Sequence, residues 1–258
     1  MLRLSPGLRT ARVDRLRRAV RSGPLPRHLG VVMDGNRRWA RAAGLDPRAG
    51  HRAGAQHLED VLRWCEAVGI DHLTVYVLSA DNIRRRGDVE IDHLMTLLET
   101  VVPQRVLSRG GHWRLHVAGD STLLPATTRA ALDHAVAATE AGPAHLTLAI
   151  GYDGRADIVN AVRAAVLDLA PQGGAPDVDA ITRRLPGGPV KDIDLVIRTS
   201  GETRLSGFFP WQCAGAELYL SALMWPAFGE ADFLRALRTY AERRRRSGQS
   251  ASTTPAHD

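Results

Sequence analysis

The chain alternates between short apolar runs and longer segments whose apolar residues recur at helical spacing. The apolar runs predict strands at residues 28–33, 73–78, 113–118, 146–150, 193–197 and 217–220. The helical spacing predicts helices at residues 53–68, 89–107, 126–140, 156–169 and 232–245. Single helices between strands imply one α/β domain with a mostly parallel central sheet of about six strands, flanked by helices.

The two ends of the chain differ from this alternating body, which spans residues 27–246. Residues 1–26 predict a basic N-terminal helix that ends at a Gly-Pro-Leu-Pro segment. Its rough apolar stripe (Leu8, Val13, Leu16 and Val20) suits packing on the body as well as contact with lipid. Residues 247–258 are polar and predict a disordered C-terminal tail.

Composition places the chain among single globular domains. It has 258 residues, of which 44% are hydrophobic and 24% are charged, and this balance excludes a disordered chain. No apolar run reaches the roughly 18 residues that span a bilayer, and the N-terminus has no signal-peptide pattern. The two cysteines, Cys65 and Cys213, have no metal-binding spacing, so we expect a reduced, cytoplasmic protein.

The net charge of +6 is concentrated at the ends of the chain. Residues 1–27 hold eight arginines and one acid, residues 243–246 are all arginine, and the body between them is net acidic. A nucleic-acid-binding module, which would carry its basic face on the fold itself, is therefore disfavoured. Basic ends suit peripheral contact with an anionic membrane, or they serve solubility alone.

Polar residues follow the first predicted strand in a pattern that suits phosphate and a metal ion. Asp34 comes at the strand end, where a carboxylate is well placed to hold magnesium. Gly35 permits close approach of an anion to the backbone, and Asn36 caps a helix whose first N–H groups suit phosphate. Arg37 and Arg38 add guanidinium donors, although a simple capped turn with solvated arginines would look the same.

Two further strand ends carry related residues. The second strand leads into Ser79, Ala80, Asp81 and Asn82, followed by arginines at 84–86. The fifth leads into Arg198, Arg204 and Ser206. Parallel strand ends meet at one sheet edge, so we predict one site for magnesium and phosphorylated substrates. P-loop, GxGxxG, HExxH and GxSxG motifs are absent from the sequence, which leaves P-loop hydrolysis, Rossmann redox, zinc proteolysis and α/β-hydrolase chemistry without support.

These segments resemble the signatures of the cis-prenyltransferases, the undecaprenyl diphosphate synthase family. Residues 28–40 are similar to its first signature and residues 194–217 to its last, and residues 50–54, 76–82 and 151–158 also fit. The resemblance implies a homodimer that condenses isopentenyl diphosphate with an allylic diphosphate, geranyl or farnesyl, and forms a Z double bond. It implies magnesium as the cofactor.

The resemblance also implies residue roles. Asp34 and Glu217 would hold the metal, and Asp34 and Asn82 would be catalytic, with Ser79 beside Asn82 and released pyrophosphate as the proton acceptor. Residues expected at the allylic diphosphate are Gly35, Asn36, Arg37, Arg38, His51 and Arg85. Residues expected at isopentenyl diphosphate are Arg198, Arg204 and Ser206. Other expected substrate contacts are Trp39, Ala80, Asp81, Ile83 and Leu205.

The chain departs from the family pattern at four positions. Pro47 stands where arginine is common, with Arg48 adjacent as a possible substitute. Leu78 and Ile83 replace aromatic residues, and Gly207 replaces an asparagine. The residues of the last signature resemble those of the actinobacterial short-chain branch, which makes (2Z,6E)-farnesyl diphosphate.

Product length should depend on an apolar tunnel below the diphosphates. We predict walls from the second strand and from the helix that carries Leu94, Leu97, Leu98, Val101 and Val102. Val77 and Leu78 either shorten this tunnel to a C15 product or only fill the core. The alternatives are a C50–C55 synthase for lipid carriers, an enzyme that joins two C5 units, and a non-catalytic partner subunit.

Overall fold

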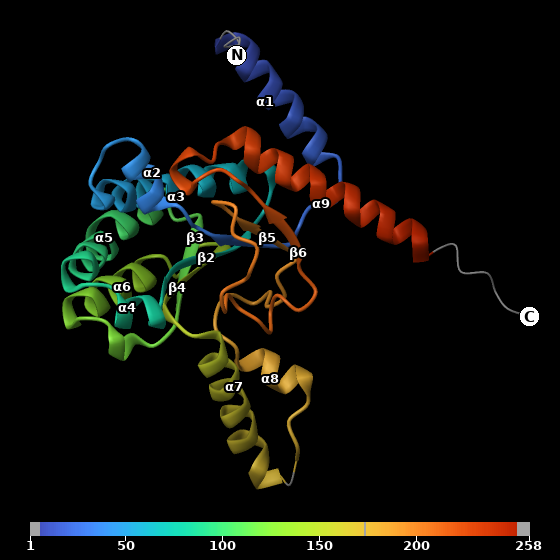
Figure 1. Ribbon diagram of the computed structural model, residues 1–258. Helices are drawn as coiled ribbons and strands as arrows, with labels where there is room; N and C mark the ends of the chain where they lie inside the picture. The colour runs from blue at the N-terminus through green and yellow to red at the C-terminus, as the bar shows by residue number, and fades with distance from the viewer. Residues whose placement is uncertain (1–5, 173, 252–258) are drawn as a thin grey trace, which may run out of the picture.

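Six parallel strands form one sheet in the computed structural model, which describes residues 6–172 and 174–251 (Figure 1). The strands are β1 (His28–Val32), β2 (His72–Ser79), β3 (Trp113–Ala118), β4 (Ala144–Tyr152), β5 (Leu195–Arg198) and β6 (Glu217–Leu220). Their order is β3-β4-β2-β1-β5-β6, and each neighbouring pair is parallel. The prediction of an α/β domain with a largely parallel sheet is confirmed.

Helices connect the strands. The α-helices are α1 (Pro6–Arg21), α2 (Asn36–Ala42), α3 (Pro47–Val68), α4 (Ala80–Arg85), α5 (Asp88–Leu107), α6 (Ala126–Ala138), α7 (Gly154–Leu169), α8 (Val178–Arg184) and α9 (Glu230–Ala251). Short 3₁₀ helices are η1 (Ser121–Leu123), η2 (Ala170–Gln172) and η3 (Trp225–Ala227). None of the helices within the described ranges is long and apolar enough to cross a membrane.

The main hydrophobic core lies between one face of the sheet and helices α3, α5, α6 and α9. The opposite face is covered near β1 and β5 by the segment 205–213, whose Phe208 and Phe209 are fully buried. Helices α7 and α8 pack on each other and project away from the sheet (Figure 1). The sheet is therefore helix-covered on one face and partly loop-covered on the other.

The strand order has its switch point at β1. From β1 the chain passes to β2 on one side, whereas β5 pairs with β1 on the other side. The connections leaving β1 and β5 therefore separate at the carboxyl edge of the sheet, where open α/β sheets bind ligands. Asp34 and Arg198 belong to this edge.

Part of the apolar stripe predicted for the N-terminal helix packs on the body, as the structure of α1 shows. Val20 is buried, and Val13 and Leu16 pack against the main core, where α1 contacts α9. The side chain of Leu8 lies outside the described residues. Burial of this stripe explains why a helix rich in arginine is held against the domain.

Two helix boundaries differ from the predictions by six residues. Helix α3 begins at Pro47 rather than near residue 53, because Asp46 caps it through a 2.8 Å hydrogen bond from the Arg48 backbone N–H and proline suits the first helical position. Helix α9 extends to Ala251, into the predicted C-terminal tail. The rest of that tail, residues 252–258, lies outside the described residues.

Candidate functional site

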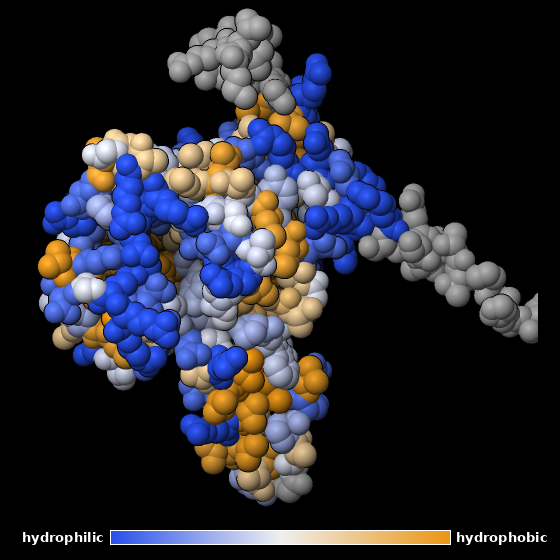
Figure 2. Space-filling view, in the orientation of Figure 1, coloured by the Kyte–Doolittle hydropathy of each residue, from blue (hydrophilic) through white to orange (hydrophobic). Residues whose placement is uncertain are grey.

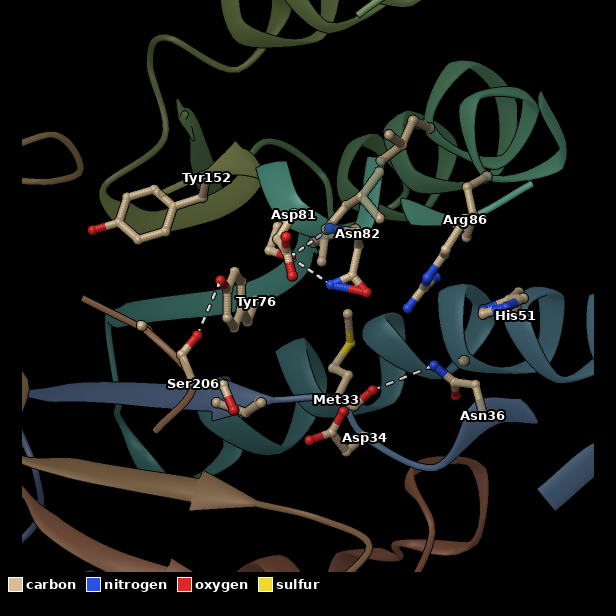
Figure 3. Close-up of a pocket in the computed structure, with 18 of the residues that line it drawn as sticks. Met33, Asp34, Asn36, His51, Tyr76, Asp81, Asn82, Arg86, Tyr152 and Ser206 are labelled. Atoms are coloured by element: carbon tan, nitrogen blue, oxygen red, sulfur yellow. Dashed lines mark hydrogen bonds between the residues drawn. The ribbon is translucent and has the colours of Figure 1, made fainter. Parts of the chain in front are cut away.

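A cavity of about 730 Å³ opens at the carboxyl edge of the sheet, between the strand ends and helices α3 to α5. Its polar part includes Asp34, Asn36, His51, Asn82 and Arg86 (Figure 3). Arg198 also lines this part. Its apolar part includes Leu58, Leu78, Leu94, Leu97, Leu98 and Val102. Charged groups at the mouth and aliphatic groups below suit a ligand with an anionic head and a hydrocarbon chain.

Asp34 and Arg198 join the ends of β1 and β5. Arg198 contacts Oδ2 of Asp34 through Nε at 2.9 Å and through Nη2 at 2.6 Å. Its Nη1 donates to Ser206 Oγ at 3.0 Å. The Arg198 side chain is 6% exposed and that of Asp34 is 37% exposed, so a buried cation supports a carboxylate that solvent and ligands can reach.

Gly50 and Gly54 on α3 leave room for Asn36, which lies beside His51 (Figure 3). A Cβ on Gly54 would lie 2.5 Å from Asn36 Oδ1, and one on Gly50 would lie 2.1 Å from the Asn36 carbonyl oxygen. Gly35, which precedes α2, has a φ of 104°, a conformation that only glycine adopts without strain. Close packing of α2 on α3 therefore depends on the absence of side chains at these positions.

Asn82 lies on α4, where Ser79 is the N-cap. The Asn82 backbone N–H donates to Ser79 Oγ at 3.0 Å, and the Asn82 side-chain amide also contacts that oxygen. Asp81 lines the cavity and pairs with Arg85 at 2.8 Å. The short helix holds the Asn82 amide at the cavity (Figure 3).

One carboxylate connects three basic side chains at the rim of the cavity. Glu90 Oε1 is 3.2 Å from His51 Nε2 and 3.1 Å from Arg86 Nη1, and Glu90 Oε2 is 3.5 Å from Arg37 Nη1. Burial is the main cause that lowers the pKa of His51, assisted by the charge of Arg86 and opposed by Glu90. His51 is therefore favoured as a neutral imidazole.

Aromatic residues close another wall. Tyr152 stacks on Phe209 with ring centroids 4.2 Å apart, and its hydroxyl donates to Asp157 Oδ2 at 2.9 Å. The Tyr76 hydroxyl donates to the Ser206 carbonyl oxygen at 3.4 Å (Figure 3). Burial raises the pKa of both tyrosines, so their hydroxyls stay protonated donors.

The structure brings half of the predicted site residues together at the cavity. Asp34, Asn36, His51, Ser79, Asp81, Asn82, Arg85, Arg198 and Ser206 line the cavity. Arg38 lies just outside it, between Ser200 and Glu202. Arg85 is at the edge, since its side chain is 79% exposed.

Other predicted residues lie apart from the cavity lining. Trp39 is one turn further along α2, Ala80 and Leu205 pack in the protein interior, and Ile83 packs on the main core. Arg204 is 78% exposed and pairs with Glu202 at 3.5 Å. None of these five residues lines the cavity, so their predicted substrate contacts stay predictions.

Glu217 is not brought to Asp34 within one chain. It pairs with Leu195 at the start of β6, whereas Arg198 at the strand end pairs with Leu220. At about 3.3 Å per residue this register places Glu217 roughly 10 Å below the edge. Its carboxylate instead accepts a hydrogen bond from Arg243 Nη1 at 3.0 Å.

Sequence reasoning missed Arg86, Glu90, Tyr76 and Tyr152. Arg86 and Glu90 are four residues apart and bear opposite charges, a spacing that signals an ion pair. The two tyrosines lie near strand ends. The sequence there does not indicate which face of the sheet an aromatic side chain occupies.

The fold and this cavity define an α/β protein with basic and polar side chains at the carboxyl edge of its sheet, above an apolar chamber. Comparisons with known proteins identify its family. The profile described as putative undecaprenyl diphosphate synthase, a prenyltransferase family, matches residues 32–248. The chain belongs to this family of prenyl-transferring enzymes.

Named relatives agree with that assignment. An isoprenyl transferase of Streptomyces fradiae is 48% identical, over 91% of this chain and 95% of the relative. The (2Z,6E)-farnesyl diphosphate synthase of Thermobifida fusca is 44% identical, over 91% of this chain and 94% of the relative. The crystal structure of lavandulyl diphosphate synthase from Lavandula x intermedia in complex with dimethylallyl diphosphate has a TM-score of 0.77 and 32% identity, and the similarity covers 84% of this chain and 95% of that one.

Proposed function

We propose that the protein condenses isopentenyl diphosphate with an allylic diphosphate, forms a new Z double bond and releases a short-chain product such as (2Z,6E)-farnesyl diphosphate. The observation that carries this proposal is the Asp34–Arg198 pair at the mouth of an apolar chamber. Similarity to a relative named for that product supports the choice of chain length.

The allylic diphosphate occupies the side of the cavity near the start of α2. Asn36 and His51 line that side, Arg37 pairs there with Glu90 at 3.5 Å, and α2 begins there without a side-chain cap. Arg38, just outside, adds a further cation. Charge-assisted hydrogen bonds from these groups fix the leaving group and leave its hydrocarbon chain to enter the apolar chamber.

Isopentenyl diphosphate occupies the side near β5. Arg198 and Ser206 are already joined at 3.0 Å, and both face the cavity. Arg204 is exposed, so its predicted contact requires movement of its side chain toward the substrate. This arrangement sets the two substrates on either side of Asp34.

Magnesium fits at Asp34. Both contacts from Arg198 go to Oδ2, which leaves Oδ1 for a metal ion. No group of three or more histidine, cysteine or acidic side chains that could hold a metal occurs among residues 6–172 and 174–251, and magnesium commonly takes one carboxylate with substrate phosphates and waters. Bound there, the ion would neutralise charge on the departing diphosphate. Glu217 as a second ligand remains a prediction.

Asn82 orients the proton transfer that ends the reaction. Its amide is a poor base, so the proton from isopentenyl diphosphate goes to the released pyrophosphate. Asn82, fixed by Ser79, positions the substrate for that transfer. Burial of the chamber beneath excludes water from the allylic centre.

Turnover with purified protein tests the proposal. The protein is incubated with magnesium, isopentenyl diphosphate and either geranyl or farnesyl diphosphate, and the dephosphorylated products are separated by length and double-bond geometry. We expect a C15 product with one new Z bond from geranyl diphosphate. Products of C50–C55 would favour the lipid-carrier alternative, and no consumption of isopentenyl diphosphate would disprove the function.

We propose that two copies pair through the projecting α7–α8 arm. Val159, Val166, Leu167 and Val178 are exposed there, and Figure 2 shows a broad apolar surface over α7. A patch of that kind on a projecting element suits burial against a second copy. Light scattering of wild type and Leu167→Asp tests this, with a dimer expected only for wild type. A monomeric wild type would contradict it.

We also propose that the arginines of α1 and α9 make peripheral contact with anionic membranes. Arg15, Arg18, Arg21 and residues 243–246 are exposed on these neighbouring helices. Sedimentation with anionic and neutral vesicles at two salt concentrations tests the contact. Equal recovery with both vesicles would contradict it, as would a preference for nucleic acid in competition.

A further inference from the structure

Arg86 occupies a place in the cavity that its neighbours in the arginine run do not. It is the C-cap of α4, with φ −84° and ψ 151°, so the chain turns out of the helix there. Its side chain is 21% exposed, against 79% for Arg85. Figure 3 shows its guanidinium directed into the cavity, between the side chains of Asn82 and His51.

Glu90 holds Arg86 in that position. The Arg86 Nη1–Glu90 Oε1 distance is 3.1 Å, and the same oxygen is 3.2 Å from His51 Nε2. Glu90 lies in the first turn of α5, so its backbone is fixed by a long helix. A guanidinium has five N–H donors, and this ion pair leaves most of them for a ligand.

The same carboxylate also identifies which substrate Arg86 faces. Glu90 Oε2 is 3.5 Å from Arg37 Nη1, and Arg37 and His51 belong to the allylic side of the site. One acid shared among three basic groups leaves an excess of positive charge at this rim. A diphosphate is the ligand that such an excess suits.

We propose that Arg86 is a binding residue for the allylic diphosphate, and that Glu90 is the positioning residue that keeps it in the cavity. The proposal rests on the proposed function and deepens it. Arg85 is the residue that the family resemblance favours, but it is exposed and paired with Asp81 at 2.8 Å. Arg86, whose guanidinium lies inside the cavity, makes the contact with the allylic diphosphate instead.

Kinetics of Arg86→Gln tests the binding role. Loss of a charge-assisted contact should raise KM for the allylic diphosphate about tenfold. KM for isopentenyl diphosphate should stay close to that of wild type. Arg52→Gln, an exposed arginine next to His51 on α3, is the matched control and should leave both values unchanged. Unchanged allylic KM in Arg86→Gln, or equal rises for both substrates, would overturn the binding role.

A second pair of variants tests the positioning role. Glu90→Gln should raise the allylic KM about threefold in wild type and by clearly less in Arg86→Gln, because in that background only the Glu90 contacts with His51 and Arg37 are still lost. Equal rises in both backgrounds, or a lower KM, would overturn that role. A merely structural defect would instead lower kcat and thermal stability without distinguishing the two substrates.

Calorimetric binding of inorganic pyrophosphate separates this inference from the proposed function. Wild-type turnover measures the function, whereas the ratio of pyrophosphate affinities for wild type and Arg86→Gln measures the contact without catalysis. We expect about tenfold weaker binding in the variant. Equal affinities in an enzyme that turns over would overturn the role of Arg86 and leave the function intact.

Discussion

Arg198 contacts a single oxygen of Asp34 with two of its nitrogens, at 2.9 and 2.6 Å, and so joins the ends of β5 and β1. The two residues are far apart in sequence but meet at the switch point of the sheet. The pair fixes the carboxylate while leaving its second oxygen available. It therefore links the position of a metal ligand to the position of a substrate-binding arginine.

Asp34→Asn should abolish most turnover. The amide keeps a hydrogen-bond acceptor for Arg198 but loses the charge that would hold magnesium, so we expect kcat to fall roughly 100-fold or more. The measurement is product formation over a range of magnesium concentrations.

Asp133→Asn, an exposed acid on α6, is the control for this variant. It should retain wild-type kcat and magnesium dependence. Turnover by Asp34→Asn near the wild-type rate, with intact folding by circular dichroism, would contradict the role of Asp34.

Gly54→Ala should displace Asn36 from the diphosphate site. The new Cβ would lie 2.5 Å from Asn36 Oδ1, so α2 and α3 must separate or the side chain must turn away. We expect a loss of about 1–3 kcal/mol in the free energy of unfolding, together with a higher KM for the allylic diphosphate.

Gly215→Ala is the matched substitution for comparison. A Cβ there meets no atom within 4 Å, so stability and KM should stay at wild-type values. If denaturant unfolding and kinetics show no difference between the two variants, close packing at Gly54 does not position Asn36.

The strand-end residues were predictable because parallel strands all end at one edge. An apolar run marks each strand, and the polar residues after it must then meet, as Asp34, Asn82 and Arg198 do. The order of the elements and the type of sheet followed from the same alternation. These conclusions need only local pattern and general topology.

Other features depended on geometry that the sequence does not contain. Which of three consecutive arginines faces the cavity depends on where α4 ends, and the extended backbone at Arg86 decides it. The position of Glu217 depends on the register of β6 against β5, which no local pattern sets. The start of α3 depended on the Asp46 cap.

Val77→Ala and Leu78→Ala should lengthen the product. Leu78 is 2% exposed and lines the apolar chamber, and Val77 lies beside it on β2. Removing these side chains opens space for further C5 units, with a cost of roughly 2–4 kcal/mol in stability for Leu78→Ala. Chromatography of the dephosphorylated products from each variant gives the chain length.

Val75→Ala separates chamber size from strand stability. Val75 is fully buried on the same strand but does not line the cavity, so the product should keep its wild-type length while stability falls. Unchanged products from both Val77→Ala and Leu78→Ala would show that these residues only fill the core.

A row of four histidines should make the protein less stable in mild acid. His28, His72, His145 and His116 come from four adjacent strands, with ring centroids 6.1, 4.9 and 5.2 Å apart in that order. Burial is the main cause that lowers the pKa of each ring, to about 4 for His28 and for His116. The four imidazole rings are therefore favoured in their neutral form in the folded protein.

The direction of the pH effect follows from proton uptake. Below the ordinary pKa of 6.5 the unfolded chain binds a proton at His28 that the folded protein does not, so stability falls as pH drops from 6.5 to 4. By pH 4.5 this residue alone should cost about 2.5 kcal/mol. The half-exposed His116 contributes in the same direction with a smaller effect, because solvent screens it.

Urea unfolding of wild type and His28→Gln between pH 7 and pH 4.5 measures this contribution. The substitution also removes the 2.8 Å contact between His28 Nε2 and Thr74 Oγ1, which shifts the whole curve of stability against pH by a constant amount. Removing the titrating ring should in addition flatten the curve, because fewer protons are then taken up on unfolding. Since carboxylates titrate equally in both proteins, the difference in slope belongs to His28, and parallel curves would mean that its ring is protonated in the folded state.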